Sequence, residues 1–328
     1  MSGHLTVAEA GESATIAAIQ KAAPSSLNGD DAAVLHPTSS NSRHVCTTDV
    51  LVCDRHFSFL YSTAYEVGVK AVSQNFADIQ AMGARPTAIL LGIATPGDTD
   101  LGVISDLARG INDAAQPWGA ELVGGDVVLS TDLVLSITAI GELGGPAAAL
   151  TLGGAGVGHR VIASGPIGYS AAGLDILRHY GSREAIPKED AIAQELVQWH
   201  CAPRLEVERG TVARAAGASS MTDNSDGLVR DLSMIAQRSG VRIDLNRSAI
   251  TPDSTLLHAA EITGVDPWEW VLTGGEDHTL IGTTDARLPT TYRPIGMVRS
   301  RVAGDETTPY VTVDGVRPAY TKGWESLR

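Results

Sequence analysis

The stretch V-C-T-T-D-V-L-V-C-D-R-H-F, residues 45–57, joins an apolar strand pattern to acidic, hydroxyl and imidazole side chains. Its first part, Val45–Val52, is rich in β-branched residues and predicts a strand. A helix is expected over Ala64–Met82, because apolar residues recur there at spacings of three and four and form one buried stripe. Ala88–Ile93 predicts the next strand. A strand, a helix and a strand in this order are typical of α/β proteins.

The same alternation continues along the chain and predicts an α/β fold with two domains. The further expected elements are a first helix within 1–23, a helix over 101–115, strands over 121–123, 132–140 and 159–164, helices over 170–180 and 189–199, a helix starting near Pro203, a strand over 220–222, a helix over 228–238, a strand over 241–245, and a hairpin turn at Asp314-Gly315. The Gly-rich stretch after residue 140 indicates a domain boundary. We therefore predict an N-terminal domain over residues 1–143 and a C-terminal domain over 144–328, which the length of 328 residues permits.

Composition excludes several classes of function. The formal net charge of −14 disfavours nucleic-acid binding, because a protein that holds the phosphate backbone needs a positive surface. The three cysteines, with no C-x-x-C, argue against a disulfide framework and a thiolate zinc site and favour a reducing compartment. No apolar run is long enough to span a bilayer, and the N-terminus has no signal-type apolar core. We expect a cytoplasmic protein that binds neither nucleic acid nor membrane.

Aspartates recur where predicted strands and helices end, usually beside glycine or a hydroxyl residue. They stand in Gly29–Val34 (G-D-D-A-A-V), Thr47–Asp49 (T-T-D), Leu122–Asp126 (L-V-G-G-D), Asp223–Leu228 (D-N-S-D-G-L) and Gly274–His278 (G-G-E-D-H), with Asp78 on the expected helix. Mg2+ prefers oxygen ligands, and glycines let backbone N–H groups approach phosphates closely. Each segment alone is typical of a turn or a helix cap. Together they favour a site for a nucleotide with Mg2+, in a chain that has no P-loop motif.

In this order the segments resemble the thiamine-monophosphate kinase family, within the superfamily shared with aminoimidazole ribonucleotide synthetase. The resemblance includes N-F-A-D-I-Q-A-M-G-A-R-P at Asn75–Pro86 and runs from about residue 29 to 285. It implies a two-domain PurM-like fold, in which the N-terminal domain pairs with its copy in a homodimer and the C-terminal domain closes the active site. It also implies a phosphotransferase that moves a phosphoryl group from ATP directly, in line, to thiamine monophosphate and gives thiamine diphosphate.

The resemblance also assigns roles to single residues. Magnesium ions would be held by Asp31, Thr47, Thr48, Asp49, Asp78, Asp126, Asp223 and Asp226. The nucleotide would lie at Gly125, Asp126 and Ser225, and the substrate would contact His56, Glu276 and Trp324. The expected catalytic residues are Asp49, Asp126 and Asp226. Catalysis would then consist of positioning and charge neutralisation.

Two positions depart from the family pattern. Leu152 stands where family members usually carry an Arg, with Arg160 a few residues further on, and Gly323–Leu327 reads G-W-E-S-L where G-W-x-H-F is common. These departures leave open a paralogue with another phosphoryl acceptor, and the missing Arg favours a protein that binds ATP and Mg2+ without turnover. An acidic protein whose aspartates are only caps is a third alternative. A selenophosphate synthetase of the same superfamily is disfavoured, because the chain has no Cys in a Gly-rich N-terminal loop.

Overall fold

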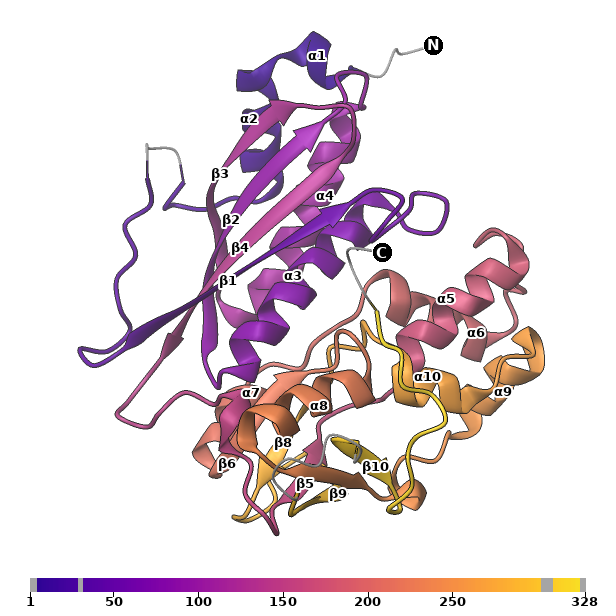
Figure 1. The fold of residues 1–328 in the computed structure, drawn as a ribbon. Helices are drawn as coiled ribbons and strands as arrows, with labels where there is room; N and C mark the ends of the chain where they lie inside the picture. Colours follow the sequence, from indigo (N-terminus) through magenta and orange to yellow (C-terminus); the bar gives the residue numbers. More distant parts are fainter. Residues whose placement is uncertain (1–4, 29–31, 302–308, 325–328) are drawn as a thin grey trace. The chain divides into compact units, whose positions relative to one another are not determined.

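Each half of the chain builds one β-sheet (Figure 1). The structure is a computed structural model that describes residues 5–28, 32–301 and 309–324. The chain divides into two compact units: unit 1 comprises Met1–Ile79 and Arg85–Ala147, and unit 2 comprises Gln80–Ala84 and Ala148–Arg328. The second unit thus includes a short segment from the end of a helix in the first half. The boundary predicted after residue 143 lies close to the division after Ala147.

The sheet of unit 1 has the strand order β1-β4-β2-β3. Its strands are β1 (Arg43–Val52), β2 (Arg85–Thr95), β3 (Glu121–Leu129) and β4 (Val134–Leu143). β4 runs antiparallel to both β1 and β2, and β3 runs parallel to β2. β1 and β3 are therefore the two edges of this sheet, a point that matters for the site.

Helices cover one face of this sheet. They are α1 (Val7–Ala10), α2 (Glu12–Ala22), α3 (Ala64–Ala81) and α4 (Leu101–Ala115), with the 3-10 turn η1 (Gln116–Trp118). The stripe predicted on α3 is confirmed, since Val72, Phe76 and Ile79 are at most 1% exposed. α3 and α4 approach so closely that a Cβ at Gly68 would stand 2.2 Å from the carbonyl oxygen of Leu107. Only glycine fits this crossing.

The other face of the unit 1 sheet carries exposed apolar side chains. Val50 on β1, Leu90 on β2 and Val128 on β3 are 48%, 38% and 51% exposed. The covered face alternates with them: Ile137 is fully buried and Leu91 is 3% exposed. This is the period-two pattern of a sheet with one packed face.

Unit 2 contains a six-stranded sheet with the order β10-β7-β9-β5-β8-β6. Its strands are β5 (Arg160–Ala163), β6 (Ala218–Asp223), β7 (Arg242–Leu245), β8 (Leu280–Thr284), β9 (Arg293–Arg299) and β10 (Val311–Val313). Only the β10–β7 pair is parallel. β6 and β8 are antiparallel neighbours, so the loop that follows β6 and the loop that precedes β8 lie at the same end of these two strands.

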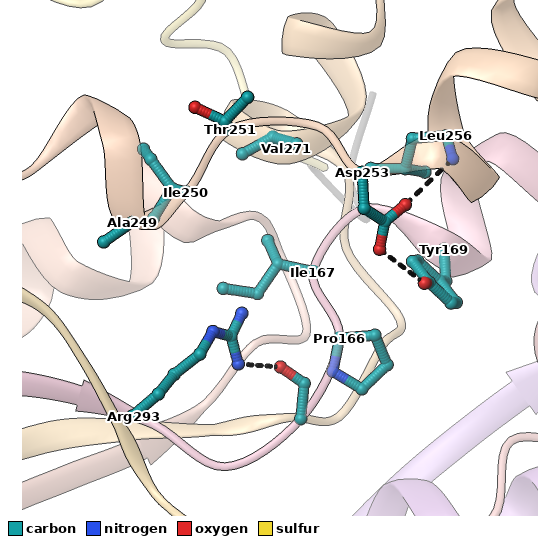
Figure 2. Close-up of a pocket in the computed structure, with 11 residues that line it drawn as sticks. Pro166, Ile167, Tyr169, Ala249, Ile250, Thr251, Asp253, Leu256, Val271 and Arg293 are labelled. Carbon is teal, nitrogen blue, oxygen red and sulfur yellow. Dashed lines mark hydrogen bonds between the residues drawn. The ribbon is translucent and has the colours of Figure 1, made fainter.

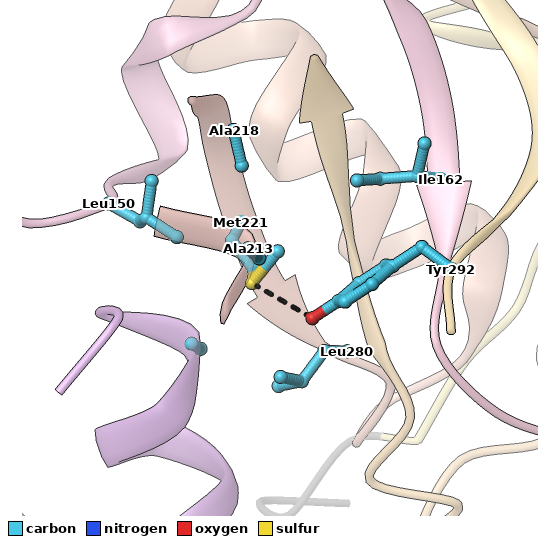
Figure 3. Packing of buried hydrophobic residues seen from close by; sticks show 8 residues of the cluster. Leu150, Ile162, Ala213, Ala218, Met221, Leu280 and Tyr292 are labelled. Atoms are coloured by element: carbon cyan, nitrogen blue, oxygen red, sulfur yellow. Dashed lines mark hydrogen bonds between the residues drawn. The ribbon is translucent and has the colours of Figure 1, made fainter. Parts of the chain in front are cut away.

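The helices of unit 2 are α5 (Tyr169–Tyr180), α6 (Ala191–Cys201), α7 (Arg209–Ala215), α8 (Leu228–Ser239), α9 (Ser254–Thr263) and α10 (Pro267–Thr273), with the turns η2 (Leu152–Gly154) and η3 (Arg247–Ala249). Figure 3 shows a buried cluster of this unit in which Leu150, Ile162 and Leu280 pack near Tyr292. The hydroxyl of Tyr292 lies 3.8 Å from the sulfur of Met221. No helix within the described ranges has the length and apolar character needed to cross a membrane.

Most predicted elements are confirmed, with one error and several omissions. The helix expected near Pro203 is wrong: the chain is irregular there, and α7 begins only at Arg209, after Glu208 with a φ of 69°. α9, α10, β8 and β9 had no predicted counterpart. The turn at Asp314-Gly315 is confirmed, since both residues have positive φ and Val313 and Val316 form an antiparallel bridge.

Candidate active site

β1 and α3 bring predicted magnesium ligands together on the covered face of the unit 1 sheet. The hydroxyl of Thr47 donates a 2.7 Å hydrogen bond to Oδ2 of Asp78, although the two residues are 31 positions apart in the chain. Asp49, two residues further along β1, projects to the same face because strand side chains alternate. Three predicted oxygen donors therefore lie on one side of this edge strand.

Thr48 projects to the open face instead. Its hydroxyl donates to the carbonyl oxygen of Ile137 at 3.0 Å and accepts from Thr138 at 3.1 Å. The pair Thr47–Thr48 is thus divided between the two faces of the sheet, which follows from the strand geometry and not from any property of threonine.

Gly125 and Asp126 lie on the opposite edge strand, β3. The register aligns Asp49, Ile137, Leu91 and Gly125 in one row across the sheet. Three strand spacings of about 4.8 Å separate the two ends of this row by about 14 Å. Two Asp side chains on one Mg2+ span at most about 12 Å between Cα atoms, since the metal–oxygen distance is only about 2.1 Å. Asp49 and Asp126 of one protomer therefore cannot ligate the same ion.

His56 lies in the turn that follows β1. Its Nδ1 accepts a 3.0 Å hydrogen bond from the backbone N–H of Val52, so Nδ1 carries no proton. The neutral ring then carries its proton on Nε2, which makes that nitrogen a donor. An isolated β-bridge, formed by the backbones of Cys53 and Phe57, holds this turn.

In unit 2, the loop between β6 and α8 brings Asp223 and Asp226 near each other. Asp223 is 4% exposed, and its Oδ2 lies 3.0 Å from Nδ1 of His278. Asp226 forms a 3.2 Å ion pair with Arg230, one helical turn further on. Burial raises the pKa of Asp226, and the charge of Asp223 adds to this shift while Arg230 opposes it.

Asp231, which was not predicted as a site residue, holds this loop through hydrogen bonds to its backbone. Its Oδ2 accepts from the backbone N–H groups of Asp226 and Gly227 at 3.1 and 3.0 Å. Burial raises the pKa of Asp231 to about 8, and the carboxylates of Asp223 and Asp226 contribute to the rise. The available signal was an acid among the apolar positions of the expected helix, since Leu228, Leu232 and Ile235 share its buried face.

Ser225 and Glu276 belong to two loops joined by backbone hydrogen bonds. The N–H of Glu276 donates to the carbonyl of Ser225 at 2.9 Å, and a Cβ at Gly275 would stand 2.0 Å from the same oxygen. Glu276 has a φ of 61°, and its Oε2 lies 3.6 Å from Nδ1 of His200. This close approach explains why the second residue of the G-G-E-D segment, Gly275, is a glycine.

Trp324 comes to the same place from the end of the described chain. Its backbone N–H donates to the carbonyl of Asp226 at 2.9 Å, and its side chain is 46% exposed. Unit 2 therefore assembles the following residues predicted from the sequence: Asp223, Ser225, Asp226, Glu276 and Trp324.

Two further positions bear on the predicted site. Asp31 lies outside the described residues. Leu152 lies in η2, where its carbonyl accepts from the hydroxyl of Ser239 at 3.0 Å. The guanidinium of Arg160 donates to the carbonyl of Ala286.

A separate pocket of about 320 Å³ lies elsewhere in unit 2 (Figure 2). Its apolar wall includes Ile167 and Ile250, and the hydroxyl of Tyr169 donates to Asp253 at 2.6 Å. Burial raises the pKa of Tyr169 to about 12, and the bond to Asp253 adds to the shift. None of the residues predicted to bind metal, nucleotide or substrate is among those that line it.

The donor atoms suit Mg2+ more than a softer metal. The predicted ligands offer only carboxylate and hydroxyl oxygens, and no three His, Cys, Asp or Glu side chains form a metal cage within the described residues. Mg2+ commonly binds through one or two carboxylates together with waters and substrate phosphates. The pairs Thr47–Asp78 and Asp223–Asp226 fit such partial sites in their chemistry, because the first offers a hydroxyl and a carboxylate and the second offers two carboxylates.

The chain is similar to known proteins along most of its length. The family model for AIR synthase related proteins, N-terminal domain, matches residues 29–143. A thiamine-monophosphate kinase of Corynebacterium glutamicum is 51% identical over 322 residues, which cover 98% of this chain and 95% of that protein. A thiamine-monophosphate kinase of Mycobacterium tuberculosis is 41% identical over 300 residues, which cover 91% and 85%. A solved structure of AaThiL complexed with AMPPCP and TMP is 30% identical, has a TM-score of 0.75 and covers 96% of this chain and 97% of that chain. The chain therefore belongs to the thiamine-monophosphate kinase family.

Proposed function

We propose that the protein transfers a phosphoryl group from ATP to thiamine monophosphate and so forms thiamine diphosphate. The observation that carries the proposal is the loop of Asp223–Asp226, which is hydrogen-bonded to the segments of Glu276 and Trp324. Residues that we expect to contact metal, nucleotide and substrate are thus hydrogen-bonded neighbours in unit 2. The names of the relatives, and the AMPPCP and TMP in the AaThiL complex, support the same substrates.

Mg2+ is part of the proposal. Bound to ATP, it would neutralise phosphate charge as the phosphoryl group moves. Asp49, Asp78 and Asp126 in unit 1, with Asp223 and Asp226 in unit 2, are the proposed carboxylate ligands. His56, whose Nδ1 accepts from the backbone N–H of Val52, and Glu276 would contact the substrate.

A homodimer is the proposed assembly. Asp49 and Asp126 stand on opposite edges of one sheet, about 14 Å apart by strand spacing. A second copy could bring its Asp126 to the Asp49 of the first. The exposed apolar residues Val50, Leu90 and Val128 give the open sheet face the character of a surface that packs against another. We also infer a cytoplasmic location, with which the three cysteines, none in a disulfide, are consistent.

The test is the formation of thiamine diphosphate from thiamine monophosphate, ATP and Mg2+, with ADP measured in parallel. We expect equal amounts of the two products and no reaction in the presence of a chelator. ADP without thiamine diphosphate would contradict the proposed acceptor. Mg2+-dependent ATP binding without either product would favour a silent binder, the alternative that Leu152 supports.

A further inference from the structure

Two buried neighbours, Asp277 and His278, connect the loop of Asp223 to the body of unit 2. They are 2% and 3% exposed. Neither was predicted as a site residue, because Glu276 was the residue of the G-G-E-D-H segment to which a role was assigned. Their contacts give them a role that their sequence position does not suggest.

The carboxylate of Asp277 ties three segments together. It accepts from the backbone N–H of Gly168 at 2.6 Å and of Ser170 at 2.8 Å, where α5 begins. It also accepts from Nδ2 of Asn224 at 3.1 Å, in the loop that follows Asp223. All three partners donate a hydrogen bond, so position 277 requires a side chain that accepts at both of its oxygens.

His278 connects the segment held by Asp277 to the side chain of Asp223. Its Nδ1 lies 3.0 Å from Oδ2 of Asp223, and its backbone N–H donates to the carbonyl of Asn224 at 3.1 Å. The two side chains are only 2% and 6% exposed, so water competes little for this bond. The bond engages Oδ2 of the carboxylate and leaves Oδ1 for another ligand.

The backbone on both sides of Asp277 is in the left-handed region. φ is 61° at Glu276 and 52° at His278, although neither is glycine. Such conformations persist only where the surrounding contacts determine them. The three hydrogen bonds to Asp277, midway between the two residues, supply that constraint.

We propose that Asp277 and His278 are positioning residues, which fix the orientation of the Asp223 carboxylate for magnesium. Asp277 holds the segment in its left-handed turn, and His278 holds Oδ2 of Asp223. Partners that hydrogen-bond a metal-ligating side chain orient it and raise metal affinity. This inference rests on the proposed function, since it treats Asp223 as a magnesium ligand.

The test compares four variants. Asp277→Asn replaces one accepting oxygen by an amide NH2 group, which faces N–H groups that also donate. His278→Ala removes the ring nitrogen that contacts Asp223. His278→Asn places an amide N–H near the position of Nδ1 and tolerates positive φ. Asp253→Asn is the matched control, because Asp253 also accepts two backbone N–H groups at a helix start, those of Thr255 and Leu256. It accepts from the hydroxyl of Tyr169 as well, but it has no bond to the 223–227 loop.

We expect Asp277→Asn and His278→Ala to raise the Mg2+ concentration for half-maximal activity about 10- to 100-fold. The Mg2+ dependence of ATP binding, measured by calorimetry, should shift equally. His278→Asn should recover most of the loss, and Asp253→Asn should behave as wild type. Hydrogen exchange in Asp277→Asn should rise in segments 166–172, 223–227 and 274–279.

Folded variants with an unchanged Mg2+ requirement would overturn the proposal, as would a His278→Asn variant no better than His278→Ala. A wild type that forms no thiamine diphosphate would contradict the proposed function instead. In that case ATP binding and hydrogen exchange still decide, since unchanged values in Asp277→Asn would exclude the positioning role.

Discussion

Asp231 is a buried acid whose two oxygens have different surroundings. Oδ2 accepts two backbone N–H groups, whereas Oδ1 has no hydrogen-bond partner within the described residues. Its pKa of about 8 in the folded state compares with an ordinary value of 3.8. The folded protein therefore holds the proton more tightly, and this contribution to stability is complete below pH 4 and is lost as the pH rises towards 8.

We predict that Asp231→Asn removes this pH dependence. Without metal, the free energy of unfolding of the wild type relative to the variant should fall by up to about 5 kcal/mol between pH 4 and pH 8. Urea unfolding at several pH values, with a chelator present, measures the difference. Curves that stay parallel over this range would show that Asp231 is ionised in the folded protein.

Asp49 and Asp126 carry the metal assignment in unit 1. We predict that Asp49→Asn or Asp126→Asn lowers kcat at least about 100-fold, because each removes a charge that would hold Mg2+ at the phosphates. Neither side chain is buried, so the thermal midpoint should stay near that of wild type. Asp132→Asn is the matched control, an exposed acid in the loop after β3. Normal turnover in Asp49→Asn or Asp126→Asn would remove that residue from the site.

At the scale of elements, two adjacent glycines of β3 differ sharply. A Cβ at Gly125 would stand 1.9 Å from the carbonyl oxygen of Leu91, which belongs to the backbone of β2. A Cβ at Gly124 would meet only the side-chain end of Leu90, at 3.2 Å. The first contact can be relieved only by moving a strand, and the second by a small side-chain rotation.

We therefore predict that Gly125→Ala is destabilising by about 3 kcal/mol, whereas Gly124→Ala costs less than about 1 kcal/mol. Because Gly125 and Asp126 are neighbours, the displaced strand should also weaken ATP binding in Gly125→Ala. Urea unfolding and calorimetry with ATP and Mg2+ test both effects. Equal stability of the two variants would mean that β3 is not held against β2 as described.

The elements also show what the sequence could predict. The strand at β1 and the stripe on α3 follow from side-chain periodicity, so their positions and the grouping of Thr47 with Asp78 were within reach. β8 and β9 were missed, because short strands in a large sheet owe their conformation to their neighbours and not to a local pattern. Asp277 was missed for a related reason, since its role depends on the N–H groups of Gly168 and Ser170, which the fold brings to it. Asp231 had a local signal, because the N–H groups that it accepts belong to Asp226 and Gly227.

At the scale of the whole molecule, the width of the unit 1 sheet bears on the metal site that we propose. Asp49 and Asp126 lie on its two edges, and the sheet is too wide for one ion to contact both. In a two-fold symmetric dimer each site would use Asp49 of one protomer and Asp126 of the other, so two equivalent sites would form. A single sequence contains no information on whether two protomers share a site in this way.

Mixed dimers distinguish a shared site from one within a protomer. If the site is shared, a dimer of one Asp49→Asn chain and one Asp126→Asn chain has one intact site and one doubly defective site, and should regain about half the wild-type activity. A dimer of wild type with the double variant should then be inactive, because each site receives one altered residue. A site within one protomer reverses both results. Two affinity tags allow each mixed dimer to be purified and its thiamine diphosphate formation to be measured, so the pair of activities decides which arrangement is present.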